Sequence, residues 1–182
     1  MNNRMYKTDL HCHTSEGSDC SSENGVATVE KYIDYGFNTL VVTNHVQYYR
    51  VDRQVRHGKH SYEWLIDRAY DAAEIAREAA GDRLNVLSGM ELCERDTQND
   101  YLIYGLTREM AKDFDLCFRD ISAISEYVRS CGGIIIQAHP MRMDMKIIPP
   151  HIYDGIEIYN SSANWLYVNS MTQMWAQINC LD

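Results

Sequence analysis

The chain has 182 residues, of which 45% are hydrophobic, which is enough for one domain with a buried core and gives no argument for a second. Its formal net charge of -9 and its pI near 5.2 disfavour extended binding to nucleic acid or anionic membranes, because those surfaces need clustered Lys and Arg. A small anionic substrate held by metal ions remains compatible with this charge. We therefore expect a single domain over residues 1–182.

The cysteines and the amino terminus indicate a reducing compartment. The six cysteines form no Cys-x-x-Cys pair, and a chain of this length does not need disulfides for stability. The first residues lack the apolar run of a secretory signal, and no stretch approaches the roughly 18 apolar residues of a membrane span. We expect a cytoplasmic protein with reduced thiols and no membrane partner.

Strand-like and helix-like segments alternate along the chain. The predicted strands are residues 6–11, 38–43, 84–92, 101–106, 133–138 and 155–159. The predicted helices are residues 26–35, 62–80, 121–131 and 165–177. This alternation favours an α/β fold with a parallel sheet or barrel, in which ligand-binding side chains gather at the carboxyl ends of the strands.

The first strand ends in a His-x-His pair. His11 and His13 flank Cys12, and the alternation of side chains along a strand points both imidazoles to one side and the thiol to the other. Two neutral imidazoles side by side suit a divalent metal. A hydrogen-bonded pair of histidines at a strand end is the alternative.

Three further strand ends carry residues of the same kind. His45 follows the second strand, Glu91 follows Leu-Ser-Gly-Met in the third, and His139 follows Ile-Ile-Gln-Ala in the fifth. Each alone is more often a hydrogen-bonded polar group than a ligand. Packing gives no reason for such residues to recur at successive strand ends, so the pattern indicates a shared metal site.

Segments in this order and spacing resemble the motifs of the polymerase and histidinol phosphatase (PHP) family. They are Thr8-Asp9-Leu10-His11-Cys12-His13-Thr14, Val42-Thr43-Asn44-His45, Gly89-Met90-Glu91, Gln137-Ala138-His139-Pro140 and Gly155-Ile156-Glu157-Ile158-Tyr159-Asn160. The likeness covers nearly the whole chain. It implies a distorted (β/α)7 PHP-type barrel that hydrolyses phosphate esters with two to three divalent metal ions, for which zinc, manganese and iron are the candidates.

The resemblance also implies individual roles. His11 and His13 would hold one metal, Glu91 would bridge it to a second metal held by His139, and His45 would serve a third site. Asp100 stands where many relatives have a histidine, and we assign it as a carboxylate ligand of the second metal. A cap at the start of a strand is the alternative for Asp100.

Two more residues are candidates for this site. Asp19 falls where some relatives have a ligand of the third metal, although it could equally be an ordinary loop residue. Arg142 follows Ala-His-Pro at a strand end and is our candidate for contacting the phosphate. Basic residues in the stretch 50–60 are a second source of cations, but a solvated charged loop is the more usual role of such a stretch.

The chain departs from the family pattern at two places. Asn44 replaces the Asp of the usual Thr-Asp-His motif, which weakens the orientation or charge balance at His45. Relatives also continue into a strand that ends in Gly-Ser-Asp-x-His, whereas this chain ends at Asp182. We expect a barrel truncated before its last strand, with natural closure by another route as the alternative. The edge left by a missing strand favours a homodimer.

The expected reaction is attack of a metal-activated water on a small phosphomonoester or a nucleotide. Glu91, His45 and Arg142 are the predicted catalytic residues. Two alternatives remain: a catalytically weakened metal-binding or ligand-binding domain, which the departures favour, and a nuclease of the same family, which the acidic charge disfavours.

Overall fold

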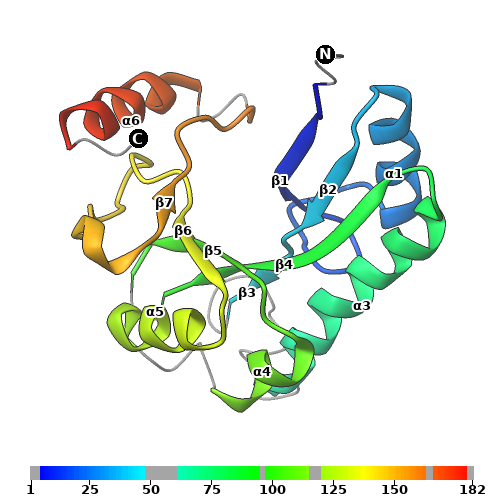
Figure 1. The fold of residues 1–182 in the computed structure, drawn as a ribbon, viewed down its shortest axis with the longest axis horizontal. Coiled ribbons are helices and arrows are strands. Elements are labelled where there is room, and N and C mark those ends of the chain that lie inside the picture. The colour runs from blue at the N-terminus through cyan, green and yellow to red at the C-terminus, as the bar shows by residue number, and fades with distance from the viewer. Residues whose placement is uncertain (1–4, 48–60, 95–96, 115–119, 163–165, 180–182) are drawn as a thin grey trace. The chain divides into compact units, whose positions relative to one another are not determined.

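The computed structural model describes residues 5–47, 61–94, 97–114, 120–162 and 166–179 (Figure 1). It divides into two compact units, Met1–Met90 and Glu91–Asp182, which we call unit 1 and unit 2. Strand β4 begins in unit 1 and ends in unit 2. Among the described residues, every helix is too short or too polar to span a bilayer.

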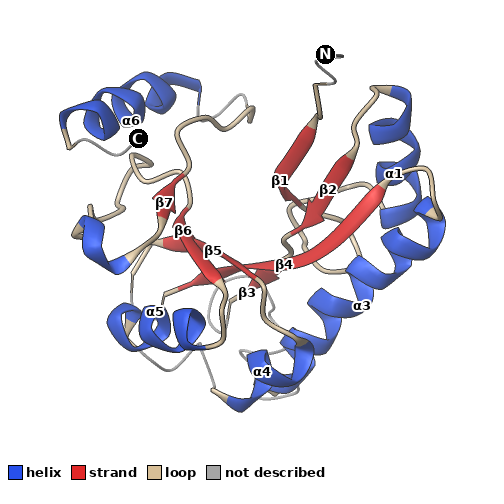
Figure 2. Ribbon diagram, viewed as in Figure 1, coloured by secondary structure: helices blue, strands red, loops and turns tan. Residues whose placement is uncertain are grey.

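Unit 1 joins parallel strands to two helices. Its elements, in chain order, are β1 (Thr8–Cys12), α1 (Gly25–Asp34), β2 (Thr39–Val42), β3 (His45–Val46), α3 (Tyr62–Ala80) and the first part of β4 (Asn85–Cys93). β2 lies between β1 and β4, and both pairings are parallel. Connections between parallel strands need a crossover, which α1 and α3 provide. Both helices lie beside these strands (Figure 2).

Small side chains allow close packing in unit 1. Ala73, Ala76 and Ala80 of α3 are fully buried in a core with Cys12, Leu40, Val42 and Val86 of the strands. Gly25 opens α1 where a Cβ would lie 3.3 Å from the backbone nitrogen of Ala76. Each helix starts at a polar cap: Asn24 accepts the backbone N–H of Ala27, and Ser61 accepts that of Trp64.

Unit 2 contains an antiparallel pair of strands. Its elements after β4 are β5 (Asp100–Tyr104), α4 (Arg108–Asp113), α5 (Ile121–Ser130), β6 (Ile134–Gln137), the 3-10 helix η2 (Pro150–Ile152), β7 (Gly155–Ile156) and α6 (Leu166–Ile178). β5 and β6 are antiparallel, whereas β6 and β7 are parallel. The expectation of a uniformly parallel sheet is therefore wrong for β5.

Glycines explain how β5 and β6 meet in opposite directions. Gly105 leaves β5 with a φ of 84°, a left-handed conformation that favours glycine. A Cβ on Gly133, just before β6, would lie 2.7 Å from the carbonyl oxygen of Tyr104. The end of β5 can therefore approach the start of β6, which an antiparallel pair requires.

The remaining predicted elements lie close to their expected places. The helices predicted at 26–35, 62–80 and 121–131 are present with ends within one residue. The strand predicted at 155–159 is shortened to Gly155–Ile156, and residue 165 of the last predicted helix lies outside the described residues. The short elements α4 and β3 were not predicted, because so few residues show no clear periodicity.

Candidate metal centre

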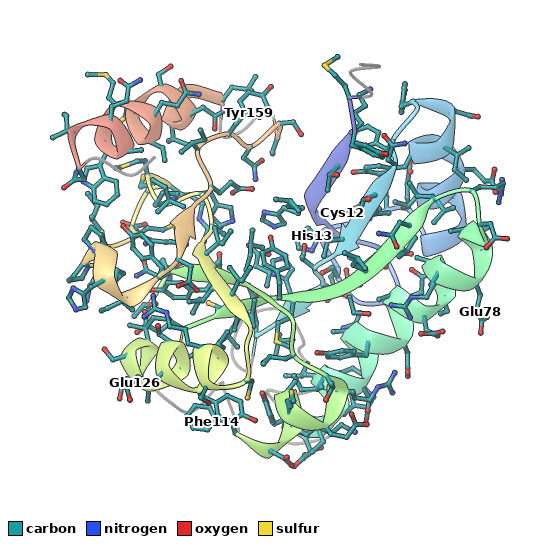
Figure 3. The ribbon with its side chains drawn as sticks, in the orientation of Figure 1. Cys12, His13, Glu78, Phe114, Glu126 and Tyr159 are labelled. Atoms are coloured by element: carbon teal, nitrogen blue, oxygen red, sulfur yellow. The ribbon has the colours of Figure 1, made fainter. Side chains whose placement is uncertain are left out.

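The end of β1 carries the first two predicted ligands. The register of β1 against β2 shifts between Asp9 and Cys12, so the strand is irregular over the residues that include His11. Asp9 holds this segment: one of its oxygens accepts the His11 backbone N–H at 2.9 Å, and the other accepts the Tyr32 hydroxyl at 2.6 Å. Cys12 is buried whereas His13 is partly exposed, and both lie at the end of β1 (Figure 3).

The His11 and His13 side chains face one another. Their Nε2 atoms are 3.1 Å apart, and their rings meet at 71°. Two imidazoles bound to one tetrahedral zinc, with Zn–N bonds of 2.0–2.1 Å, place their nitrogens about 3.3 Å apart. The pair therefore has the donor type and the spacing that one divalent ion requires. The same spacing also fits the alternative of a hydrogen-bonded pair.

Asn44 holds the loop that follows β1. Its side-chain oxygen accepts the Thr14 backbone N–H at 2.8 Å, and its amide nitrogen donates to the Thr14 hydroxyl at 3.1 Å. Asn44 is fully buried, and a Cβ on Gly17 would lie 2.2 Å from its amide nitrogen. Asn44, which departs from the family motif, thus stabilises this loop, since its amide accepts a hydrogen bond from the Thr14 backbone and donates one to the Thr14 hydroxyl.

Ser18 connects the histidines of two strands. Its hydroxyl oxygen lies 3.2 Å from His13 Nδ1 and accepts the His45 backbone N–H at 3.1 Å. The His13 and His45 rings stack with centroids 4.5 Å apart, and Gln47 lies 3.1 Å from His45 Nδ1. Partners at the second ring nitrogen are the usual means by which a protein orients a metal-binding histidine.

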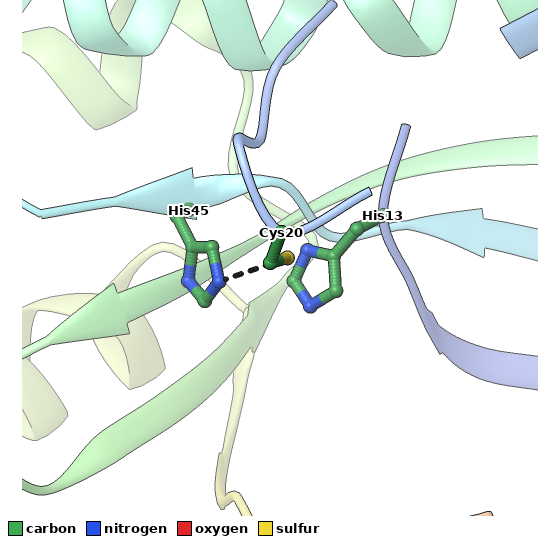
Figure 4. A group of neighbouring side chains, drawn as sticks. All are labelled: His13, Cys20 and His45. Atoms are coloured by element: carbon green, nitrogen blue, oxygen red, sulfur yellow. Dashed lines mark hydrogen bonds between the residues drawn. The ribbon is translucent and has the colours of Figure 1, made fainter. Parts of the chain in front are cut away.

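Cys20, the neighbour of the predicted ligand Asp19, lies beside His13 and His45. Cys20 Sγ lies 3.5 Å from His45 Nε2, and the donor atoms of His13, Cys20 and His45 all lie within 4.8 Å of one another (Figure 4). Asp19 instead forms an ion pair with Arg68 at 3.2 Å. Asp19 as a metal ligand stays a prediction, and the sequence analysis did not single out Cys20, because only the path of the loop brings its thiol to His45.

Unit 2 brings Glu91 and His139 together. Glu91, in β4, is 1% exposed, and its carboxylate lies 2.9 Å from His139 Nε2. His139 follows β6 with a left-handed φ of 28°, and its backbone N–H donates to the Glu157 carboxylate at 2.8 Å. Such a conformation costs of the order of 1–3 kcal/mol and is concentrated at functional sites. Glu157 thus holds His139 in place, a role that its sequence position did not indicate.

Asp100 opens β5 beside the same histidine. Its carboxylate is 4.0 Å from His139 Nε2 and accepts a hydrogen bond of 2.7 Å from Arg142, which also donates to the Gln98 carbonyl. Asp100 is 1% exposed. Two buried carboxylates, Glu91 and Asp100, lie next to one guanidinium, and this arrangement favours a further positive charge, which a divalent cation would supply.

The structure thus groups most predicted site residues within each unit. In unit 1, His11, His13 and His45 are neighbours, and in unit 2, Glu91, Asp100, His139 and Arg142 are neighbours. Cys12 is separate, because burial raises the pKa of its thiol to about 11 and leaves it a core residue. The basic stretch 50–60 lies outside the described residues.

Comparisons with known proteins establish the fold but not a family. No protein-family model matches the sequence, and no curated protein matches it significantly. Among solved structures, the chain is similar to a protein from Bifidobacterium adolescentis assigned as a metal-dependent phosphoesterase, with 13% identity, a TM-score of 0.55 and coverage of 96% of this chain and 85% of that one.

The chain is also similar to an amidohydrolase from Chromobacterium violaceum, solved with bound sulfate and no metal. The identity is 12%, the TM-score is 0.52, and the match covers 91% of this chain and 82% of the other. At such low identities a structural likeness shows a shared fold and not a shared activity. The chain therefore has an α/β fold that two hydrolases also use.

Proposed function

We propose that the chain is a metal-dependent phosphoesterase of the PHP type. The observation that carries the proposal is the pair of Nε2 atoms from His11 and His13, 3.1 Å apart at the end of a strand. The grouping of Glu91, Asp100 and His139 in unit 2 supports it with a second set of metal-binding side chains. A distorted (β/α)7 barrel and two to three ions of zinc, manganese or iron belong to the same proposal.

The chain's own residues have separable roles in this reaction. His11 and His13 would hold one ion, and Ser18 would keep the His13 ring oriented through Nδ1. A divalent ion at such a site lowers the pKa of a bound water and offsets charge on phosphoryl oxygens. Glu91 and His139, which lie within hydrogen-bond distance, would bind metal or hold a proton there. That Glu91 bridges two ions stays a prediction from the family resemblance.

The contacts of Arg142 indicate a role beside Asp100. Its guanidinium donates to the buried Asp100 carboxylate and to the Gln98 carbonyl. We infer that Arg142 positions Asp100 as a ligand and compensates its charge. Contact of Arg142 with the phosphate stays a prediction.

The sulfate bound by the amidohydrolase neighbour supports a tetrahedral oxyanion as the ligand, because sulfate and phosphate share shape and acceptor oxygens.

Metal analysis and turnover of p-nitrophenyl phosphate test the proposal together. The metal-loaded chain should hydrolyse this monoester, and the double substitution His11→Ala/His13→Ala should remove one bound ion and the turnover. His151→Ala is the matched control, since His151 is exposed in η2 and contributes to neither group. Unchanged metal content in the double variant, or a chain that binds no metal after reconstitution, would refute the assignment.

A second candidate function is hydrolysis of an amide or cyclic amide. The similarity to an amidohydrolase favours it, because a metal-activated water can attack a carbonyl carbon as well as phosphorus. Parallel assays with p-nitrophenyl phosphate, bis-p-nitrophenyl phosphate and an anilide separate the three reactions. Turnover of the anilide alone would replace the phosphoesterase by the amidohydrolase, and bound metal without any turnover would indicate a binding domain.

A further inference from the structure

The His13, Cys20 and His45 side chains form a donor group with a sulfur atom in it (Figure 4). We propose that Cys20 is a metal ligand and that it makes the site at His45 selective for zinc-like ions over manganese. This inference rests on the proposed function, which places a metal at His45. It adds the identity of a ligand and the preference for an ion, neither of which the motif positions indicate.

The distance between sulfur and nitrogen fits a shared ion. A tetrahedral zinc with a Zn–S bond of 2.3 Å and a Zn–N bond of 2.0–2.1 Å holds its sulfur and nitrogen about 3.6 Å apart. Cys20 Sγ and His45 Nε2 are 3.5 Å apart. A ring nitrogen of His13 also lies within 4.8 Å of both atoms, but His13 is assigned to the ion at His11, so Cys20 and His45 are the two protein ligands that we propose for this site.

The surroundings of His45 and Cys20 favour coordination. The Gln47 amide nitrogen lies 3.1 Å from His45 Nδ1 and fixes the orientation of the ring. Exchanging the positions of the amide nitrogen and oxygen would let the oxygen accept an N–H at Nδ1, which leaves the His45 Nε2 lone pair for a metal. Arg68 holds the loop that carries Cys20, because it donates to the Glu16 carbonyl and to the Asp19 carboxylate. Cys20 itself is exposed, so a dissolved ion can reach it and its thiol proton can leave to solvent.

A thiolate changes which ion is bound. Soft sulfur donors select zinc and similar ions, whereas manganese and magnesium prefer oxygen. Removing a partner that merely orients a metal ligand costs 10- to 100-fold in affinity. We therefore expect Cys20→Ser to lower the zinc affinity of this site by at least about 100-fold and to change manganese affinity much less.

Cobalt(II) bound to the full chain tests the ligand directly. A thiolate bound to cobalt gives an intense charge-transfer absorption in the near ultraviolet, which nitrogen and oxygen ligands do not give. The band should appear in the unsubstituted chain and in the control Cys131→Ser, a partly buried cysteine at the end of α5. It should disappear in Cys20→Ser. A band that survives in Cys20→Ser, or cobalt binding without a band, would overturn the proposal.

A second measurement needs no variant. Alkylation of the full chain with iodoacetamide, followed by peptide mass spectrometry, reports the modification of Cys20 with and without zinc. Zinc should protect Cys20 at least tenfold more than manganese does, and equal modification would overturn the proposal. Turnover of phosphate esters without the cobalt band counts against this inference alone. The band without turnover counts against the proposed function alone.

Discussion

The ion pair between Arg142 and Asp100 gives a strong test of the site in unit 2. The Arg142 guanidinium lies 2.7 Å from a carboxylate that is 1% exposed, while the Arg142 side chain is 16% exposed. Removing one partner of such a buried pair costs about 3–5 kcal/mol, because the other charge is left buried and uncompensated. Arg142→Ala should therefore lose about that much free energy of unfolding, which is a large share of the stability of a small domain.

Urea denaturation with a chelator present measures this loss without a contribution from bound metal. Arg129→Ala is the control. Arg129 pairs with Asp154 at 2.9 Å, but both side chains are about one-third exposed, so its loss should stay below about 1 kcal/mol. Asp100→Asn combined with Arg142→Ala should recover part of the loss, because a neutral amide replaces the buried charge. Equal losses for Arg142→Ala and Arg129→Ala would refute the reasoning.

Three further changes test individual contacts by urea or thermal unfolding. Asn44→Ala should lower the free energy of unfolding by about 1–3 kcal/mol, because the buried Thr14 N–H and hydroxyl lose their partner. Asn44→Asp keeps an acceptor for the Thr14 N–H and should cost less. A larger loss for Asn44→Asp than for Asn44→Ala would contradict the structural role of these hydrogen bonds. Gly17→Ala should cost about 1–3 kcal/mol, since its Cβ would lie 2.2 Å from Asn44, and an unchanged melting temperature would show that the loop relaxes freely. Burial raises the pKa of Glu94 in the folded chain, so folding favours the protonated carboxyl. The free energy of unfolding of the wild type therefore falls as the pH rises from the Glu94 pKa of the unfolded chain to that of the folded chain. Glu94→Gln does not titrate, so its free energy of unfolding relative to that of the wild type should be higher at pH 7 than at pH 4. The same difference in free energy of unfolding at both pH values would refute the effect.

Local sequence signals were sufficient for most elements of this protein. The apolar periodicity of residues 62–80 predicted α3 with the bounds it has, because a long amphipathic helix is determined by its own side chains. The His11 and His13 pair could also be recognised in the sequence, since His11 lies in β1 and His13 directly follows it. In both cases the relevant groups are close neighbours in the chain.

Contacts between distant segments could not be read from the sequence. The antiparallel direction of β5 against β6 depends on the close approach of Gly133 to Tyr104, and nothing in either strand alone encodes it. The sequence indicated that Asn44 weakens the metal site at His45, whereas in the structure its amide forms hydrogen bonds with Thr14, 30 residues earlier in the chain. Periodicity reports which face of an element is buried, and it does not report which element is packed against that face.

The sequence by itself determined an α/β chain with imidazoles and carboxylates at its strand ends, because periodicity and residue chemistry are local properties. Only the tertiary structure decided which of these groups meet. It paired Arg142 with Asp100, set Asp19 against Arg68, and brought Cys20 to His45 across 25 residues of chain. Metal binding depends on distances of a few ångströms between side chains, and folding alone sets those distances.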